Sequence, residues 1–339
     1  MKRKLLSMFV ASTLLLGSLT ACAPKQAPTG GDKSGLKVSM VTDVGGVNDQ
    51  SFNQSAWEGL QRAEKDFGIK VSYQESHQEA DYAPNIEILV DQNADLIWGV
   101  GFKMGDAIQE AAGHYPDNKF AIIDYAYENT PENVIGVIFK EEEASYLVGL
   151  IAGKMTQTNK IGFIGGMDVP VINRFQYGFI AGVKQANPDA TVEVQFANAF
   201  DDPAKGKAIA KQMYQRGVDI IFHAAGDTGT GMIEAAKEEG KFAIGVDRDQ
   251  NDLAPDNVIT SAMKRVDNAI YEVSKELSQG KFEGGRTIVY GLKEGGVDIA
   301  PTTSKNVPKE ILDFVEQEKQ RIINGEFKVP SSQEELDKM

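Results

Sequence analysis

The sequence predicts an α/β protein made of two doubly wound lobes with a ligand cleft between them. From Leu36 onward, short apolar strands alternate with amphipathic helices, which indicates parallel sheets with helices on both faces. This alternation starts again near residue 140, and the 339-residue chain is long enough for two domains. Ligands of open α/β sheets bind at the carboxyl ends of the strands, so we expect a small ligand to be enclosed where the lobes meet.

The expected elements follow the spacing of the apolar residues. In the first run we expect strands at 36–42, 69–74, 95–100, 119–125 and 133–139, and helices at 51–68, 82–93, 104–113 and 141–155. In the second run we expect strands at 160–165, 191–196, 218–224, 241–246, 257–262 and 286–291, and helices at 171–186, 203–216, 229–239, 265–279 and 308–324. The polar tail, residues 326–339, is expected to fray.

The first 21 residues are typical of a secretory signal peptide. Basic residues at 2–4 precede an apolar run at 5–16, and Leu-Thr-Ala-Cys at 19–22 matches the bacterial lipobox. We therefore expect cleavage before Cys22 and lipidation of its sulfur; the alternative is an ordinary signal peptide with an accidental Cys. Cys22 is the only cysteine in the chain, which excludes an intramolecular disulfide and a Cys-based metal site.

Residues 22–35 start with this cysteine and are rich in Pro, Gly, Ser and Lys, which indicates a flexible tether. No later segment approaches about 18 consecutive apolar residues, so we expect the lipid alone to attach the protein to the membrane. The formal charge is −14, and loss of three basic residues with the signal peptide makes it −17. Lys and Arg are not concentrated in any stretch, so we expect no binding to nucleic acid.

Polar residues fill the expected loop between the first strand and the first helix. Asn48 and Asp49 would offer an amide and a carboxylate to a ligand, but such residues also shape loops and cap helices, and the pattern favours neither role. Ser51 is the expected N-cap. Trp57, in the following helix, would stack on a planar ligand or pack in the core.

Two aspartates occupy corresponding places in the two runs. Asp124 ends the strand KFAIID, and Asp247 follows the strand KFAIGV. A carboxylate at a strand tip facing a cleft accepts hydrogen bonds from ligand hydroxyl or N–H groups. A turn or cap role is the alternative, but one such tip in each lobe favours binding. Lys264 would anchor a ligand oxygen beside Asp247.

Two further segments offer cleft residues. Phe200 precedes the helix that Pro203 opens, where it would be exposed at the cleft or act as a hydrophobic staple. Gly226 begins GDTGTG, whose glycines let backbone N–H groups approach a ligand, although the segment lacks the Gly-Lys-Ser/Thr of a P-loop. His-Glu-x-x-His and Gly-x-Ser-x-Gly motifs are absent, and the Ser-x-x-Lys at 261–264 lacks its partner motifs, so we expect neither an enzyme nor a cofactor.

Together these motifs resemble the BMP family of lipoproteins, the substrate-binding proteins of ABC transporters for purine nucleosides. The resemblance covers about residues 36–325, and its most specific parts are the first motif, 43–59, and RFQYGFIAGV at 174–183. It implies the type I periplasmic-binding-protein fold, with three crossings between the lobes. It implies that lobe 1 is formed by residues 36–139 and about 264–297, and lobe 2 by residues 140–263 and about 298–325.

The resemblance also implies the ligand contacts. Two aromatic rings, one from each lobe, would hold the purine: Trp57 and Phe200. Three residues would read the base: Asn48, Asp49 and Asp124. A ribose-binding pair and a backbone contact would complete the site: Asp247, Lys264 and Gly226. Arg174 and Phe175 belong to the family motif, but the resemblance implies no ligand contact for them.

The sequence therefore predicts a lipid-anchored, extracytoplasmic receptor that binds guanosine, inosine or adenosine. It would act as a monomer and deliver the nucleoside to an ABC transporter permease and its ATPase. Three alternatives remain open: a receptor of the same fold for a sugar or other small molecule, a secreted nucleoside hydrolase, and a signalling or adhesion lipoprotein. The isolated aspartates supply no obvious metal cluster for nucleoside hydrolysis, which disfavours the second.

Overall fold

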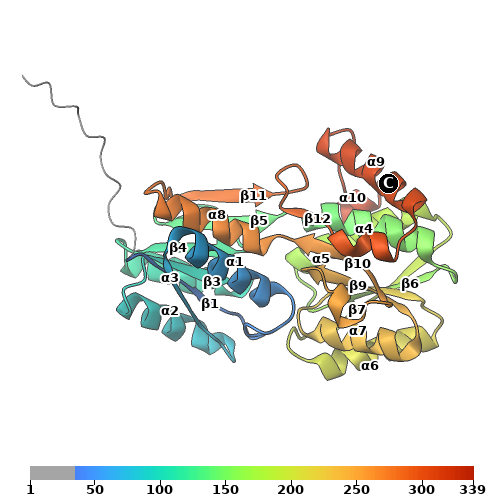
Figure 1. The fold of residues 1–339 in the computed structure, drawn as a ribbon, viewed down its shortest axis with the longest axis horizontal. Coiled ribbons are helices and arrows are strands. Elements are labelled where there is room, and N and C mark those ends of the chain that lie inside the picture. Colours follow the sequence, from blue (N-terminus) through green and yellow to red (C-terminus); the bar gives the residue numbers. More distant parts are fainter. Residues whose placement is uncertain (1–34) are drawn as a thin grey trace, which may run out of the picture. The chain divides into compact units, whose positions relative to one another are not determined.

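Two six-stranded sheets form the framework of the computed structural model, which describes residues 35–339 (Figure 1). These residues belong to one compact unit. The predicted signal peptide, the lipidation site Cys22 and the tether as far as residue 34 lie outside the described residues. From residue 35 to the end of the chain, no helix is both long enough and apolar enough to cross a membrane.

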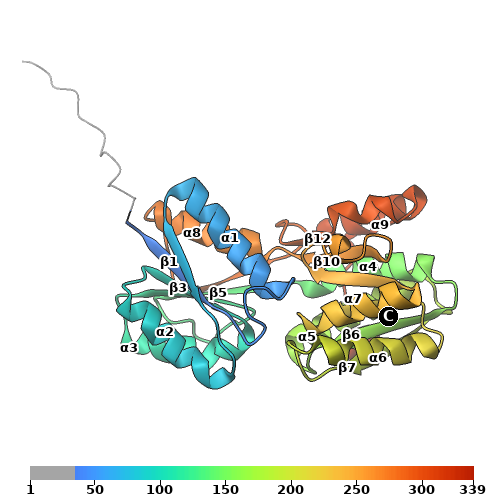
Figure 2. The same ribbon diagram turned by 60° about the horizontal axis from the view of Figure 1, so that its bottom comes forward.

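The first sheet is parallel throughout. In spatial order its strands are β11 (Arg286–Tyr290), β5 (Val134–Phe139), β4 (Lys119–Ile123), β3 (Leu96–Val100), β1 (Lys37–Val41) and β2 (Lys70–Gln74). One face is covered by α1 (Phe52–Phe67) and α8 (Val266–Ser278), and the other by α2 (Tyr82–Asp91) and α3 (Gly105–His114) (Figure 2). This sheet and its helices are called lobe 1 below.

The second sheet is parallel except at one edge, where β12 (Val297–Ile299) runs antiparallel to β10 (Val258–Lys264). The order continues through β9 (Phe242–Asp247), β8 (Ile220–Ala224), β6 (Lys160–Gly165) and β7 (Thr191–Phe196). Its helices are α4 (Glu141–Met155), α5 (Pro170–Ala186) and α9 (Lys309–Ile323) on one face, and α6 (Pro203–Gln215) and α7 (Thr228–Glu239) on the other. This second unit is called lobe 2 below. The three-residue strand β12 is too short to give a sequence signal.

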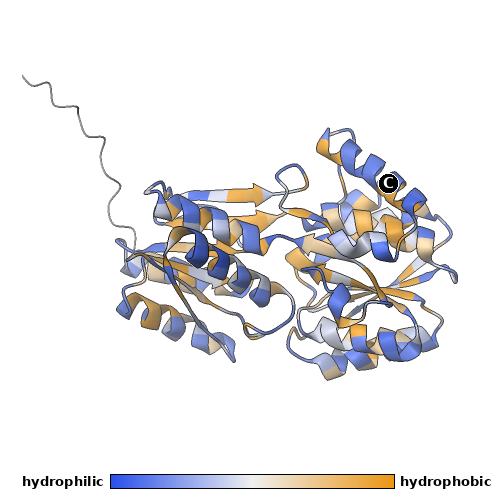
Figure 3. Ribbon diagram, viewed as in Figure 1, coloured by the Kyte–Doolittle hydropathy of each residue, from blue (hydrophilic) through white to orange (hydrophobic). Residues whose placement is uncertain are grey.

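The central strands form because most of their side chains are apolar on both faces. All five residues of β3 are buried, as are all five of β8. Continuous apolar runs of this length are typical of parallel strands that have helices on both sides. Figure 3 shows the consequence: the strands at the centre of each sheet are hydrophobic, whereas the outer faces of the helices are hydrophilic.

The described chain passes between the two sheets three times: between β5 and α4, between β10 and α8, and between β11 and β12. The predicted two-lobed α/β fold is confirmed. Because of these crossings, each lobe is assembled from separated stretches of chain, and the carboxyl ends of both sheets face each other near the crossings (Figure 1).

The tail beyond residue 326 is not frayed, contrary to our expectation. Val329 and Leu336 are buried in the same core cluster as α4 and α5. A short helix, α10 (Gln333–Leu336), follows Ser332, whose hydroxyl accepts a hydrogen bond from the Glu335 N–H at 3.3 Å. Two apolar residues among many polar ones dock this segment, and a composition-based argument does not detect so small an anchor.

Candidate ligand-binding site

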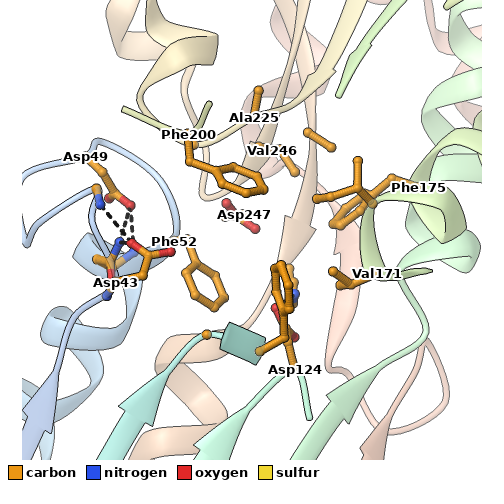
Figure 4. A pocket seen from close by; sticks show the side chains of 18 residues that line it. Asp43, Asp49, Phe52, Asp124, Val171, Phe175, Phe200, Ala225, Val246 and Asp247 are labelled. Atoms are coloured by element: carbon orange, nitrogen blue, oxygen red, sulfur yellow. Dashed lines mark hydrogen bonds and ion pairs between the residues drawn. The ribbon is translucent and has the colours of Figure 1, made fainter. Parts of the chain in front are cut away.

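A pocket lies between the lobes at the carboxyl ends of their strands (Figure 4). It contains about 570 Å³ of space not filled by protein atoms, which includes some space open to solvent. Six of the eight predicted ligand-binding residues line it: Asp49, Asp124, Phe200, Gly226, Asp247 and Lys264. They follow different strands of the two sheets, as the strand-end argument requires.

The other two predicted contacts, Asn48 and Trp57, do not line this pocket. Asn48 is exposed, and Trp57 packs edge-on against Tyr73 with ring centroids 4.9 Å apart. Phe52, five positions before Trp57 on α1, lines the pocket instead. Five helical residues span about 7.5 Å along the axis and about 140° of rotation, so these two rings cannot both face the ligand.

Asp49 holds the loop before α1 in place. Its carboxylate accepts hydrogen bonds from the backbone N–H groups of Ser51, Asn53 and Gln54 at 2.8–3.0 Å, and from Asn53 Nδ2 at 2.9 Å. Ser51 occupies the expected N-cap position, but its hydroxyl does not cap the helix. Asp49 supplies the oxygen that caps these N–H groups, so the loop role that the sequence left open is present.

Asp43 also lines the pocket, and our sequence analysis did not select it. Its Oδ1 accepts hydrogen bonds from Asn53 Nδ2 at 2.7 Å and from the Gly45 N–H at 2.9 Å. Burial raises the pKa of Asp43 to about 6, although the hydrogen bonds from Asn53 and Gly45 oppose the rise. A signal was available, because Asp43 follows β1 much as Asp124 follows β4.

Asp124 is paired with Lys264 rather than grouped with Asn48 and Asp49. Its backbone has a φ of 66°, in the left-handed region that Asp tolerates better than most residues. Its Oδ2 accepts a hydrogen bond from Lys264 Nζ at 2.6 Å. Burial raises the pKa of Asp124 despite the opposing charge of Lys264. The resemblance placed Asp124 with the base-reading residues, whereas the structure places it beside the predicted ribose-binding pair.

Lys264 remains positively charged in this buried position. Burial alone would lower the pKa of its ammonium, but the charges of Asp124, Glu141 and Asp247 outweigh that effect and raise it. The ammonium also lies 5.1 Å from the ring centroid of Phe52, within the range of a cation–π contact.

Asp247 occupies the corresponding strand tip of lobe 2, with a φ of 65°. Its Oδ2 accepts a hydrogen bond from the Ser51 hydroxyl at 2.5 Å, so this contact joins the lobes. Burial raises the pKa of Asp247 to about 7, opposed by the charge of Lys264 and the Ser51 hydrogen bond. Asp247 therefore carries a partial charge near neutral pH.

Phenylalanine rings line the pocket from both lobes: Phe52 and Phe102 from lobe 1, and Phe175 and Phe200 from lobe 2. Figure 4 shows Phe52 and Phe200 on opposite sides of the pocket. Phe200 packs against glycines. A Cβ atom on Gly166 would lie 2.1 Å from the Phe200 ring, and one on Gly226 would lie 3.0 Å from the Phe200 carbonyl oxygen. Gly226 also has a φ of +55°, which side-chain-bearing residues rarely adopt. Of the two roles considered for Phe200, the structure shows a pocket position.

Helix α5 of lobe 2 gives the pocket an apolar wall. Val171, Ile172 and Phe175 of α5 line it, and all three are largely buried. The family resemblance implied no ligand contact for Phe175, although an apolar residue in an amphipathic helix can line a pocket as well as a core.

The comparisons with known proteins agree with this geometry. Residues 36–333 match the family model described as ABC transporter substrate-binding protein PnrA-like. The chain belongs to this family. It is similar to the ABC transporter nucleoside-binding protein BmpA of Lactococcus lactis subsp. cremoris, with 38% identity over 98% of this chain and 100% of that one. It is also similar to the CD4+ T-cell-stimulating antigen of Listeria innocua, with 44% identity over 96% of this chain and 97% of that one.

The solved structure of another solute-binding protein supports both the family assignment and the fold. The solute-binding protein of an ABC transporter system from Aeropyrum pernix K1 superimposes with a TM-score of 0.81 at 32% identity, covering 89% of this chain and 96% of that chain. This PnrA-like protein is therefore a substrate-binding protein of an ABC transporter, with the type I periplasmic-binding-protein fold. Members of the family bind and deliver substrates rather than transform them, so the protein is not an enzyme.

Proposed function

We propose that this substrate-binding protein is an extracytoplasmic, lipid-anchored receptor for nucleosides that prefers purine nucleosides. It is held at the membrane through Cys22, acts as a monomer and hands its ligand to the permease and ATPase of its transporter. The name of the Lactococcus relative, which describes nucleoside binding, supports the ligand class. The anchor rests on the lipobox, and the monomer on the need to dock a single permease.

The observation that carries the proposal is that aromatic rings from both lobes and a charged end, formed by Asp124, Asp247 and Lys264, line the same pocket. Phe52 and Phe200 enter from opposite lobes, which suits a planar base held between two rings. Each base–aromatic stack contributes about 1–3 kcal/mol in proteins that bind single-stranded nucleic acids. Trp57 had been expected in this role, and Phe52 replaces it in the proposal because Phe52 lines the pocket.

The charged end suits the ribose. Asp124 Oδ1 is buried and accepts no hydrogen bond from residues 35–339, so it has an acceptor available for a ligand hydroxyl. Asp247 and Lys264 line the same pocket and supply a second carboxylate and an ammonium donor. A nucleoside is neutral and its hydroxyl groups donate readily to carboxylates, so the negative pocket does not repel it.

The polar groups of the first loop are proposed to contact the base. Asp43 and Asp49 line the pocket on the lobe 1 side, apart from the charged end (Figure 4). Asp49 accepts four hydrogen bonds, three of them from the backbone, whereas Asp43 accepts only two from the residues around it. Asp43 is therefore the better candidate to accept a hydrogen bond from the base. Together with two stacks, these contacts are consistent with binding near −8 kcal/mol or better, or about 1 μM and below.

Titration calorimetry tests the proposal directly. The protein without its signal peptide is freed of carried-over ligand by unfolding and refolding, and is then titrated with guanosine, inosine, adenosine, cytidine, free purine base and ribose. We expect sub-micromolar binding of at least one purine nucleoside and much weaker binding of cytidine, base and ribose. Refolded protein that binds free sugars tightly and nucleosides not at all would be a sugar receptor of the same fold.

A further inference from the structure

A buried glutamate contacts the charged end of the pocket from outside the pocket lining. Glu141 is the first residue of α4, just after the chain crosses from lobe 1, and its side chain is 0% exposed. It does not line the pocket. Its Oε2 accepts a hydrogen bond from Arg174 Nε at 2.7 Å, and its Oε1 lies 3.2 Å from Lys264 Nζ. Burial of a carboxylate is costly unless it is paired, and here two cations share one carboxylate.

The ammonium of Lys264 has three N–H bonds, and its neighbours determine where they point. One N–H donates to Asp124 Oδ2 at 2.6 Å, and the ammonium lies 3.2 Å from Glu141 Oε1. The ammonium also lies 5.2 Å and 5.7 Å from the ring centroids of Phe139 and Phe175. Glu141 Oε1 accepts no hydrogen bond among the described residues, so its contact with the ammonium is an ion pair, and Lys264 keeps an N–H bond for a ligand oxygen in the pocket that it lines.

Without Glu141, Asp124 alone would hold the Lys264 ammonium by direct contact with a carboxylate. Asp124 has a second buried oxygen without a hydrogen-bond partner among the described residues, so the ammonium would be free to shift toward the centre of that carboxylate. Such a shift would turn the remaining N–H away from the ligand. An error of about 1 Å in a polar contact is enough to weaken it substantially.

Arg174 supplies the second cation that this arrangement needs. Three carboxyl groups, those of Asp124, Glu141 and Asp247, raise the pKa of Lys264, so one ammonium alone does not balance them. Burial would lower the pKa of Arg174, but Glu141 raises it, and the guanidinium stays charged. The resulting chain of alternating charges runs from Asp124 in lobe 1 through Lys264 and Glu141 at two crossings.

We propose that Glu141 is a positioning residue for ligand binding: it fixes the Lys264 ammonium so that one N–H points at a hydroxyl-bearing part of the ligand, and Arg174 in lobe 2 holds Glu141 in turn. This gives Arg174 of the RFQYGFIAGV motif a role without direct ligand contact. The inference rests on the proposed function, because a hydroxyl-bearing ligand in this pocket is what Lys264 would contact. Glu141 acts only through Lys264, which distinguishes it from a residue that merely stabilises the fold.

The test is a double-mutant cycle read by calorimetry with the purine nucleoside that the wild-type protein binds most tightly. Glu141→Gln keeps the size of the side chain but removes its charge, and we expect its affinity to fall about tenfold. In a Lys264→Met background the same change is expected to alter affinity less than twofold, because the group that Glu141 positions is gone. Glu143→Gln is the matched control, because Glu143 is also buried at the start of α4 but accepts its hydrogen bond from the Leu292 N–H at 2.7 Å. We expect Glu143→Gln to bind like the wild type.

Other outcomes have distinct meanings. Wild-type affinity in folded Glu141→Gln, or an equal loss in the Lys264→Met background, would overturn the inference while leaving the nucleoside receptor intact. Wild-type protein that binds no nucleoside would overturn the proposed function, and this inference with it. If circular dichroism shows that Glu141→Gln is unfolded, Arg174→Gln takes its place in the same cycle, with an expected loss of about threefold that also disappears without Lys264.

Discussion

The two lobes offer the pocket different chemistry from the same topological place. In lobe 1, the loop between β1 and α1 contributes Asp43 and Asp49, whereas in lobe 2 the start of α5, after β6, contributes Val171 and Ile172. Each segment follows the strand next to one edge of its sheet. The polar loop is shaped by its own internal hydrogen bonds, and the apolar segment by burial against the core. The difference indicates that these two segments contact different parts of the ligand.

The lobes are more alike at their strand tips, and the remaining difference is informative. Asp124 and Asp247 have nearly the same φ, 66° and 65°. Asp124 is paired with the Lys264 ammonium, whereas Asp247 accepts a hydrogen bond from a neutral hydroxyl. The same backbone position therefore holds two carboxylates with different hydrogen-bond partners, although burial raises the pKa of both.

The largest expected effect is the loss of the Phe52 ring. Phe52→Ala removes one of the two rings proposed to stack on the base, and we expect the affinity for a purine nucleoside to fall about thirtyfold, since a stack contributes about 1–3 kcal/mol. Trp57→Ala is the matched control on the same helix. It should reduce affinity less than threefold and instead lower the melting temperature, because Trp57 packs against Tyr73 outside the pocket. Calorimetry and thermal melts measure both quantities.

The reverse result would contradict the assignment of Phe52 as the stacking ring of lobe 1. If Trp57→Ala loses more affinity than Phe52→Ala, the binding arrangement differs from the pocket seen here. The ring predicted from the family resemblance would then be the stacking partner.

The next effect is the pH dependence that Asp247 confers on binding. A ligand hydroxyl donates to the ionised carboxylate, so binding is strongest above the pKa of about 7 and weakens as pH falls through it. Between pH 8 and pH 5.5 we expect about a tenfold loss of affinity for a nucleoside that does not itself titrate in this range. In Asp247→Asn this slope should disappear. A slope retained in Asp247→Asn would assign the titration to another group, and Asp43, with a pKa of about 6, is the one that Asp43→Asn would test.

The raised pKa of Asp247 predicts the opposite pH dependence for the stability of the ligand-free protein. The pKa of Asp247 is raised from its ordinary value of 3.8 to about 7, so the folded state binds more protons than the unfolded state between those values. The free energy of unfolding therefore decreases as pH rises from about 4 to about 7. Melting temperatures of the wild type and Asp247→Asn should diverge over this range, with the variant becoming relatively more stable at the higher pH.

Much of the fold could be predicted from the sequence, because each central strand is an apolar run bounded by turn residues. The strand-tip aspartates were also predictable, because an acidic residue directly after a buried strand must lie at the sheet's carboxyl edge. The arrangement of Asp124 beside Lys264 was not predictable in this way. It depends on the crossing that brings the end of β10 against lobe 1, and this contact joins residues 140 positions apart.

The aromatic and apolar residues of the pocket were harder to predict from the sequence. Phe52 and Trp57 are both large rings near the start of α1, and only the rotation of the helix on its sheet decides which one faces the pocket. The apolar residues of α5 gave no signal at all, because a buried cleft wall and a core face have the same composition. Docking of the tail through Val329 and Leu336 was missed for a related reason, since two apolar residues are too few to form a pattern.

The smallest expected effect concerns the contacts that join the two lobes beside the pocket. Arg248, which follows β9 in lobe 2, donates from Nη1 to Gln50 Oε1 at 3.1 Å, and its Nη2 lies 3.6 Å from Glu58 Oε1. Both partners belong to lobe 1, so these contacts exist only while the lobes are together. Partly exposed pairs of this kind contribute about 0.2–1 kcal/mol, so we expect Arg248→Ala to speed nucleoside dissociation about threefold. Association should change less, because opening must break the contacts whereas initial capture does not need them.

A matched control separates this effect from a general loss of charge. Arg216 also lies in lobe 2, but it pairs with Glu193 of the same lobe. Arg216→Ala removes the same charge without touching the contacts between lobes, so its dissociation rate in stopped-flow measurements should stay within about 1.5-fold of the wild type. Equal acceleration in the two variants would mean that net charge, rather than a contact between the two lobes, governs release. Acceleration in Arg248→Ala alone would show that the lobes hold the ligand partly by holding each other.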